Sequence, residues 1–177
     1  LQMKNKFIIF LSIFYLFFLN LYANTTPPFK NISVHEKPIQ YNKIVFEDFD
    51  NQQIDLKNYN NEIYILNFWA TWCAPCKKEM PSLDKLQQNK NIEIFAINLE
   101  TKNEKKTKKF FKDLKIKNLS IFYDPDLKLV KLFTIRGVPT SVILNKDRKE
   151  IARIIGDVDF SNTDFINWLL NSVGNKQ

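Results

Sequence analysis

The sequence is most informative at Asn67-Phe68-Trp69-Ala70-Thr71-Trp72-Cys73-Ala74-Pro75-Cys76-Lys77-Lys78-Glu79-Met80-Pro81, a stretch that holds both cysteines of the 177-residue chain. The near-continuous apolar run at residues 63–69 predicts a central strand buried on both faces. A helix is expected from about residue 74 to residue 88, and Pro75 suits its first turn, where no amide hydrogen is needed. Residues three apart share a helix face, so the sulfurs of Cys73 and Cys76 can meet in a disulfide.

Most other sites that use two cysteines at this spacing need residues that the chain lacks. A zinc site takes about four ligands, whereas the only histidine, His35, is distant in sequence. A covalent c-type haem would need a histidine directly after Cys76, where Lys77 stands. A structural disulfide that closes so short a loop would add little stability. Thiol redox chemistry is therefore favoured, and the helix start would stabilise a thiolate on Cys73.

Two further functions stay open on the same residues. A copper-binding metallochaperone could use the cysteine pair, because soft thiolate ligands select Cu(I). A thiol peroxidase on the same fold would need a thiol tuned for peroxide near the helix start. Metal titration of the reduced protein and peroxide consumption that depends on Cys73 would identify these two functions.

Strands and helices alternate along the chain and end in a hairpin followed by a helix. Strands are expected at residues 45–49, 53–56, 63–69, 92–98, 120–123, 140–144 and 150–155, and helices at 74–88, 104–114, 127–133 and from Ser161 onward. The pattern Thr101-Lys102-Asn103-Glu104 predicts a capping box at the start of the second helix. The fold class is thus α/β, with a central mixed β-sheet flanked by helices on both faces, an N-terminal β-hairpin and a central αβ insertion.

The N-terminal part divides into a targeting segment and a linker. Residues 1–23 combine a basic start, an apolar run and the small residue Ala23, as in a signal peptide or an N-terminal membrane anchor. The rest is then expected in the periplasm or at the outer face of the cytoplasmic membrane. Residues 24–43, with three prolines and no periodicity, are expected to be a linker before a domain at residues 44–177. The net charge of +7 comes without a nucleic-acid recognition motif, so no nucleic-acid partner is expected.

Residues 67–81 resemble the active-site segment of the TlpA/ResA branch of the thioredoxin superfamily, and Gly137-Val138-Pro139-Thr140 resembles the cis-proline loop of that family. The resemblance covers about residues 44–172 and implies a thioredoxin fold. It also implies that Pro139 is cis and that the backbone of Val138 is presented to an extended substrate segment.

The resemblance implies a role for each catalytic residue. Cys73 would be the attacking nucleophile and Cys76 the resolving thiol. Thioredoxin itself carries a buried aspartate at the strand position that Asn67 occupies here. An asparagine, unlike an aspartate, cannot exchange protons. Glu79 resembles the buried glutamate of the cytochrome-maturation members, where burial would raise its pKa and let it shuttle protons. The alternative is that Glu79 is a solvated residue of a Lys-Lys-Glu surface run.

Together these residues predict a thiol–disulfide oxidoreductase whose only redox group is its own disulfide, with no other cofactor and no metal. The expected catalytic residues are Cys73, Cys76 and Glu79, and the expected substrate-binding residues are Trp72, Pro75, Val138 and Pro139. Strong oxidants of the exported compartment tend to carry a histidine between the two cysteines, which destabilises their disulfide. Ala74-Pro75 contains no such histidine, so this protein is expected to be a reductant. Its expected partners are a disulfide-containing client, either an apocytochrome c or a copper-site protein, and a membrane electron donor. Association with the membrane would occur through the N-terminal segment.

Overall fold

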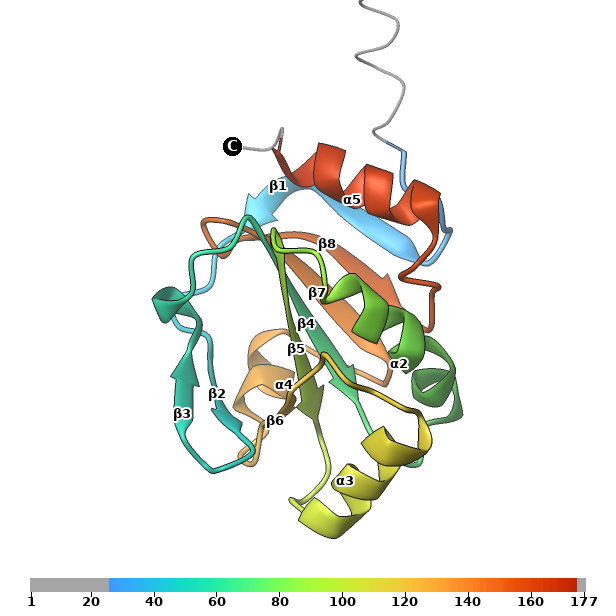
Figure 1. Cartoon of the computed structure of the whole chain (residues 1–177). Helices are drawn as coiled ribbons and strands as arrows, with labels where there is room; N and C mark the ends of the chain where they lie inside the picture. Colours follow the sequence, from blue (N-terminus) through green and yellow to red (C-terminus); the bar gives the residue numbers. More distant parts are fainter. Residues whose placement is uncertain (1–25, 175–177) are drawn as a thin grey trace, which may run out of the picture.

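The computed structural model describes residues 26–174, which form one eight-stranded mixed sheet with helices on both faces (Figure 1). The elements are β1 (Ile32–Ile39), β2 (Val45–Asp48), β3 (Gln53–Asp55), the 3-10 helix η1 (Leu56–Asn58), β4 (Ile63–Trp69), α2 (Ala74–Leu86), β5 (Ile92–Asn98), α3 (Glu104–Asp113), β6 (Ile121–Tyr123), α4 (Lys128–Leu132), β7 (Thr140–Asn145), β8 (Glu150–Ile155) and α5 (Thr163–Gly174). The strand order is β1-β8-β7-β4-β5-β6-β2-β3. The predicted leader, residues 1–23, lies outside the described residues. Within residues 26–174, no helix combines the length and apolar character needed to cross a membrane.

The central strand β4 is buried along its whole length, as its apolar sequence predicts. It pairs in parallel with β5 and antiparallel with β7. Ile65 and Trp69 contribute to the core that holds buried side chains of α2, α3 and α5. Leu66 and Phe68 contribute to the core on the opposite face, which α4 covers. The predicted mixed sheet with helices on both faces is therefore confirmed.

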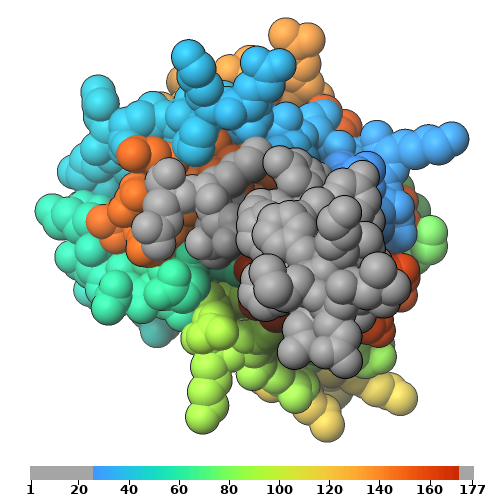
Figure 2. Space-filling model, turned by 90° about the horizontal axis from the view of Figure 1, so that it is seen from above, coloured from blue at the N-terminus to red at the C-terminus, as the bar shows by residue number. Residues whose placement is uncertain are grey.

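The predicted linker at residues 24–43 is wrong for β1, because residues 32–39 form a strand at the edge of the sheet. Ile32 pairs with Ile154 and Val34 with Ala152 in antiparallel register. Figure 2 shows this N-terminal segment (blue) against the orange β8 region. The register shifts before Ile39, in the part of the strand that contains Pro38. Proline is tolerated on edge strands and at bulges, so the proline content concealed a real strand.

A buried polar cluster joins residues 35–41, the second half of β1 and the residues after it, to the strand β8. The Glu150 carboxylate is fully buried. It accepts hydrogen bonds from the Tyr41 hydroxyl at 2.6 Å and from Arg153 at 2.8 and 2.9 Å, and His35 Nε2 lies 2.9 Å away. Burial alone would raise the pKa of Glu150, but the hydrogen bonds from Arg153, Tyr41 and His35 outweigh it and lower that pKa below its usual value.

The capping residues at the starts of two helices differ from prediction by one or two positions. The N-cap of α3 is Asn103, whose side chain accepts a hydrogen bond from the Lys106 amide. The predicted capping box at Thr101 is therefore wrong. Asn162 accepts a hydrogen bond from the backbone of α5, at the position predicted for Ser161. Asparagine caps a helix as well as serine or threonine does, so sequence alone does not choose between neighbouring candidates.

Candidate active site

The cysteine pair lies at the start of α2, where the polypeptide leaves β4. Cys73 is the N-cap residue and forms a disulfide with Cys76, with an S–S distance of 2.04 Å and Cα atoms 5.3 Å apart. The Cys76 amide donates a hydrogen bond to Cys73 Sγ at 3.1 Å. A helix start presents free amides and the positive end of the helix dipole. After reduction, the same amide would stabilise a thiolate on Cys73.

The residues around the disulfide differ in their access to solvent. Trp72 is 69% exposed, and Ala74 and Pro75 are also exposed. Cys73 is 2% exposed, whereas Cys76 has no exposed surface. A partner disulfide would therefore reach Cys73 before Cys76, which agrees with the roles predicted for the two thiols. Trp72 and Pro75 form the accessible surface next to the reactive sulfur.

The second predicted motif lies beside the cysteine loop. The Val138–Pro139 peptide bond is cis, as predicted. Thr140 is paired with Phe68 near the end of β4, so Pro139 lies at the end of the central strands from which the cysteine loop departs. The Thr140 hydroxyl donates a hydrogen bond to the Gly137 carbonyl at 2.8 Å and closes the turn. The structure thus brings the two motifs together, while substrate binding by Val138 and Pro139 stays a prediction.

Glu79 is a core residue and not part of a solvated surface run. It is 2% exposed, and its Oε1 accepts a hydrogen bond from Asn67 Nδ2 at 2.8 Å. Burial raises the pKa of Glu79 to about 8, while the Asn67 amide and the backbone of Val158 act in the opposite direction and the charge of Asp157 adds to the rise. The predicted burial and the direction of the pKa shift are therefore confirmed, and the proton-transfer role stays a prediction.

Two buried acceptors without partners favour the protonated form of Glu79, although the hydrogen bond from Asn67 itself favours the ionised form. Asn67 Nδ2 also donates to Ser141 Oγ at 2.9 Å. In the described part of the chain, Asn67 Oδ1 and Glu79 Oε2 are both buried without a hydrogen-bond partner. Both are acceptors when the carboxylate is ionised, whereas a protonated carboxyl group supplies a donor. The raised pKa of Glu79, about 8, lies close to the ordinary thiol pKa of about 8.5.

Sequence reasoning missed the residues that surround Glu79 from other elements. Ser141 faces Asn67 because β4 and β7 pair in that register. Asp157 and Val158 reach Glu79 from the loop after β8. The register of an antiparallel pair and the path of a loop depend on tertiary packing. No local signal in the sequence would have identified these neighbours.

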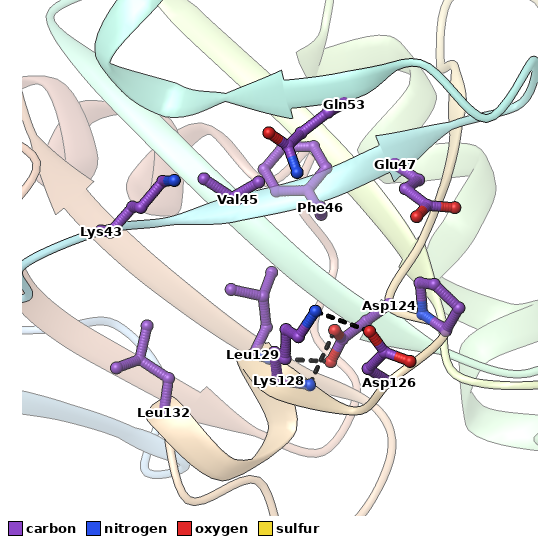
Figure 3. Close-up of a pocket in the computed structure, with 11 residues that line it drawn as sticks. Lys43, Val45, Phe46, Glu47, Gln53, Asp124, Asp126, Lys128, Leu129 and Leu132 are labelled. Carbon is purple, nitrogen blue, oxygen red and sulfur yellow. Dashed lines mark hydrogen bonds and ion pairs between the residues drawn. The ribbon is translucent and has the colours of Figure 1, made fainter.

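A separate groove lies between the β2–β3 hairpin and α4, on the face of the sheet opposite to α2 (Figure 3). Two aspartates in this groove have structural roles. Asp124 accepts hydrogen bonds from three backbone amides at the start of α4, and Asp126 forms an ion pair with Lys128 at 2.6 Å. The groove is thus separated from the reactive sulfurs by the sheet itself.

The chain is similar to several known proteins. The sequence profile of the AhpC/TSA family matches residues 38–152. Thiol-disulfide oxidoreductase ResA of Bacillus cereus is 34% identical over 116 residues, which cover 64% of this chain and 66% of that relative, slightly less than two thirds of its length. A solved structure of a secreted thiol-disulfide isomerase from Corynebacterium glutamicum has a TM-score of 0.69 at 21% identity and covers 85% of this chain and 96% of the other. StoA from Bacillus subtilis has a TM-score of 0.60 at 25% identity, with coverages of 74% and 98%. These likenesses confirm the predicted thioredoxin fold.

Proposed function

Since this chain belongs to the AhpC/TSA family, we propose that it is a thiol–disulfide oxidoreductase that exchanges its cysteine pair with disulfides in partner proteins. The observation that carries the proposal is the disulfide between Cys73 and Cys76 at the start of α2, beside the cis-proline loop. The similarity to ResA supports the same reaction class.

The reaction starts at Cys73 and ends with a disulfide in this chain. The Cys73 thiolate attacks one sulfur of the client disulfide, so that a mixed disulfide forms and one client thiolate leaves. Cys76 then loses its proton and attacks Cys73 Sγ, which releases the second client thiolate. The client gains two electrons and this chain loses them. Glu79, one turn after Cys76 on the same helix, accepts the proton of the Cys76 thiol.

The direction of transfer is reduction of the client. Ala74-Pro75 places no charged histidine between the cysteines, and such a histidine destabilises the disulfide in strong oxidants. The chain works outside the cytoplasm, as the sequence of residues 1–23 suggests, and receives electrons from a membrane dithiol protein. Its clients are apocytochromes c with a haem-binding cysteine pair, or copper-site proteins of respiratory oxidases. It uses its own disulfide and no other cofactor.

A trapping experiment tests this function. The Cys76→Ser variant cannot resolve the mixed disulfide, so it should retain clients that are bound through Cys73 and released by dithiothreitol. The Cys73→Ser variant, which keeps the buried thiol alone, is the matched control and should retain none. Equal capture by both variants, or no capture by either, would contradict the proposal.

The redox potential tests the direction separately. A reductant should have a potential well below about −120 mV, the value of a strong oxidant of exported proteins. The measurement is equilibration of the cysteine pair with glutathione buffers of known potential. A value near about −120 mV would reverse the proposed direction and leave the exchange reaction intact. Peroxide consumption that depends on Cys73, or tight Cu(I) binding without exchange activity, would replace the proposal with one of the alternatives.

A further inference from the structure

A groove of about 330 Å³ lies between the start of α2 and α3, directly beside the disulfide. Its apolar and basic lining residues are Trp72, Lys77, Lys106, Lys109, Phe110 and Leu114. Trp72 immediately precedes Cys73, so a chain segment in this groove would lie next to the attacking sulfur. The groove belongs neither to the cysteine pair nor to the cis-proline loop.

The apolar part of the groove continues into the core through Phe110. Phe110 is largely buried, and its ring stacks on the Trp69 ring with centroids 4.7 Å apart. Trp72, by contrast, exposes most of its indole to solvent. Exposed aromatic side chains are frequent anchors of protein contact surfaces, and Trp72 lines the same groove as Phe110. The groove can therefore hold an apolar side chain of a bound segment.

The charged lining of the groove consists of three lysines and one aspartate, Asp113, so its net charge is positive. Lys106 and Lys109 form exposed ion pairs with Glu100 and Asp113, and exposed pairs of this kind are weak. Lys77 has no carboxylate within ion-pair distance in the part of the chain that the structure describes. Residues 100–117, which include α3, hold eight lysines against three acidic residues. Of these eight lysines, Lys106 and Lys109 line the groove, and together with Lys77 they outnumber its single aspartate.

We propose that this groove selects clients that carry acidic residues, with an apolar neighbour, next to their reactive disulfide. This inference rests on the proposed exchange function and adds the chemistry of its partner. Carboxylates of the client lie against Lys77 and Lys109, and its apolar side chain lies on Trp72. Positive potential at a binding surface accelerates encounters with acidic partners and disfavours basic ones.

Two disulfide peptides that differ only in the charge of their flanking residues test the inference. One carries two aspartates beside a Cys-x-x-Cys disulfide and the other carries two lysines at the same positions. The reduced protein should react about tenfold faster with the acidic peptide at low ionic strength. The ratio of the two rate constants should fall toward one as salt rises from about 0.01 M to about 1 M, because salt screens surface charges. Because both peptides react with the same Cys73 thiolate, its intrinsic reactivity enters both rate constants equally and does not affect their ratio.

Charge reversal locates the selectivity. In the double variant Lys77→Glu with Lys109→Glu the ratio should invert. The matched control is Lys90→Glu with Lys146→Glu, which changes the net charge equally at two exposed residues. These residues lie in turns at the other end of the central strands, close to Ile92 and Asn145. Both of those residues pair with Ile63, the first residue of β4. The control should keep the ratio of the unchanged protein.

The outcomes separate this inference from the function on which it rests. A ratio near one in the unchanged protein, or equal effects in both double variants, would overturn the inference and leave the exchange function standing. Failure to react with either peptide would overturn the exchange function itself. If the groove variant lost binding to anionic phosphatidylglycerol vesicles and kept its peptide ratio, the basic surface would serve a membrane contact and the client proposal would be wrong.

Discussion

Replacing Glu79 with glutamine should remove a pH dependence of folding stability that is worth several kcal/mol. The ordinary pKa of the group is 4.5 and burial raises it to about 8 in the folded protein. Between these values the folded protein keeps a proton that the unfolded chain has released. The contribution of Glu79 to the free energy of unfolding therefore falls by about 1.4 kcal/mol for each pH unit in this range, to a total on the order of 5 kcal/mol. Glutamine stays neutral and has no such slope.

Denaturant unfolding of the oxidised protein at several pH values between about 5 and about 8 measures this effect. The Glu79→Gln curve should diverge from the unchanged protein toward higher relative stability as pH rises. Glu62→Gln is the matched control, because Glu62 lies near the start of β4 outside the buried core. Parallel stability curves for Glu79→Gln and the unchanged protein would show that Glu79 is ionised in the folded state throughout.

The same substitution should also slow the second step of exchange. Glutamine cannot accept the proton of the Cys76 thiol, so the mixed disulfide should persist about 100-fold longer, the lower range for loss of a general base. Rapid quenching with acid followed by mass spectrometry measures the lifetime of that intermediate. An unchanged lifetime and pH profile would remove Glu79 from the mechanism while leaving its effect on stability intact.

Replacing Glu150 with alanine should cost about 3–5 kcal/mol of folding stability. The substitution leaves Arg153 partly buried without its bidentate partner and removes the acceptor of Tyr41. His35, in β1, loses its contact as well, so residues 35–41 should detach from the sheet. Thermal unfolding and limited proteolysis of the N-terminal segment measure these effects. Glu36→Ala, an exposed glutamate of the same strand, is the control and should change stability little.

The pH dependence of this cluster has the opposite sign to that of Glu79. The pKa of Glu150 is lowered in the folded protein, so its contribution is present above the ordinary pKa of 4.5 and is lost as pH falls through the folded value. The Glu150→Ala variant should therefore approach the stability of the unchanged protein in acid. A stability difference that stays constant below pH 4.5 would mean that Glu150 acts through packing rather than through its charge.

The sequence predicted the elements whose local pattern agrees with their final environment. The apolar run of β4, the cysteine spacing and Pro139 each point to the structure that is observed. The expected resemblance to ResA is confirmed by 34% identity to one such protein. The strand β1 was missed because its partner is β8, more than a hundred residues away, and the proline signal was stronger than its weak alternation.

The prediction of the site was correct for residues that are close in sequence and incomplete for residues that only tertiary packing brings together. Cys73, Cys76 and Glu79 lie on one helix or at its cap, so their spacing was sufficient to place them together. Ser141 joins this group only through the pairing of β7 with β4. The basic groove likewise forms where α3 packs beside the start of α2, a contact between elements that periodicity does not reveal.

The position of β1 at the border of the sheet bears on how the protein behaves when it is shortened. Without β1, the largely buried β8 would present an open row of backbone donors and acceptors, which is a template for intermolecular pairing and aggregation. The outer part of β1 instead carries Glu36, Lys37 and Pro38, residues that discourage a further strand from adding. A chain trimmed to residues 44–174 would lose this protection against intermolecular pairing, so a soluble version of this domain has to begin before Ile32.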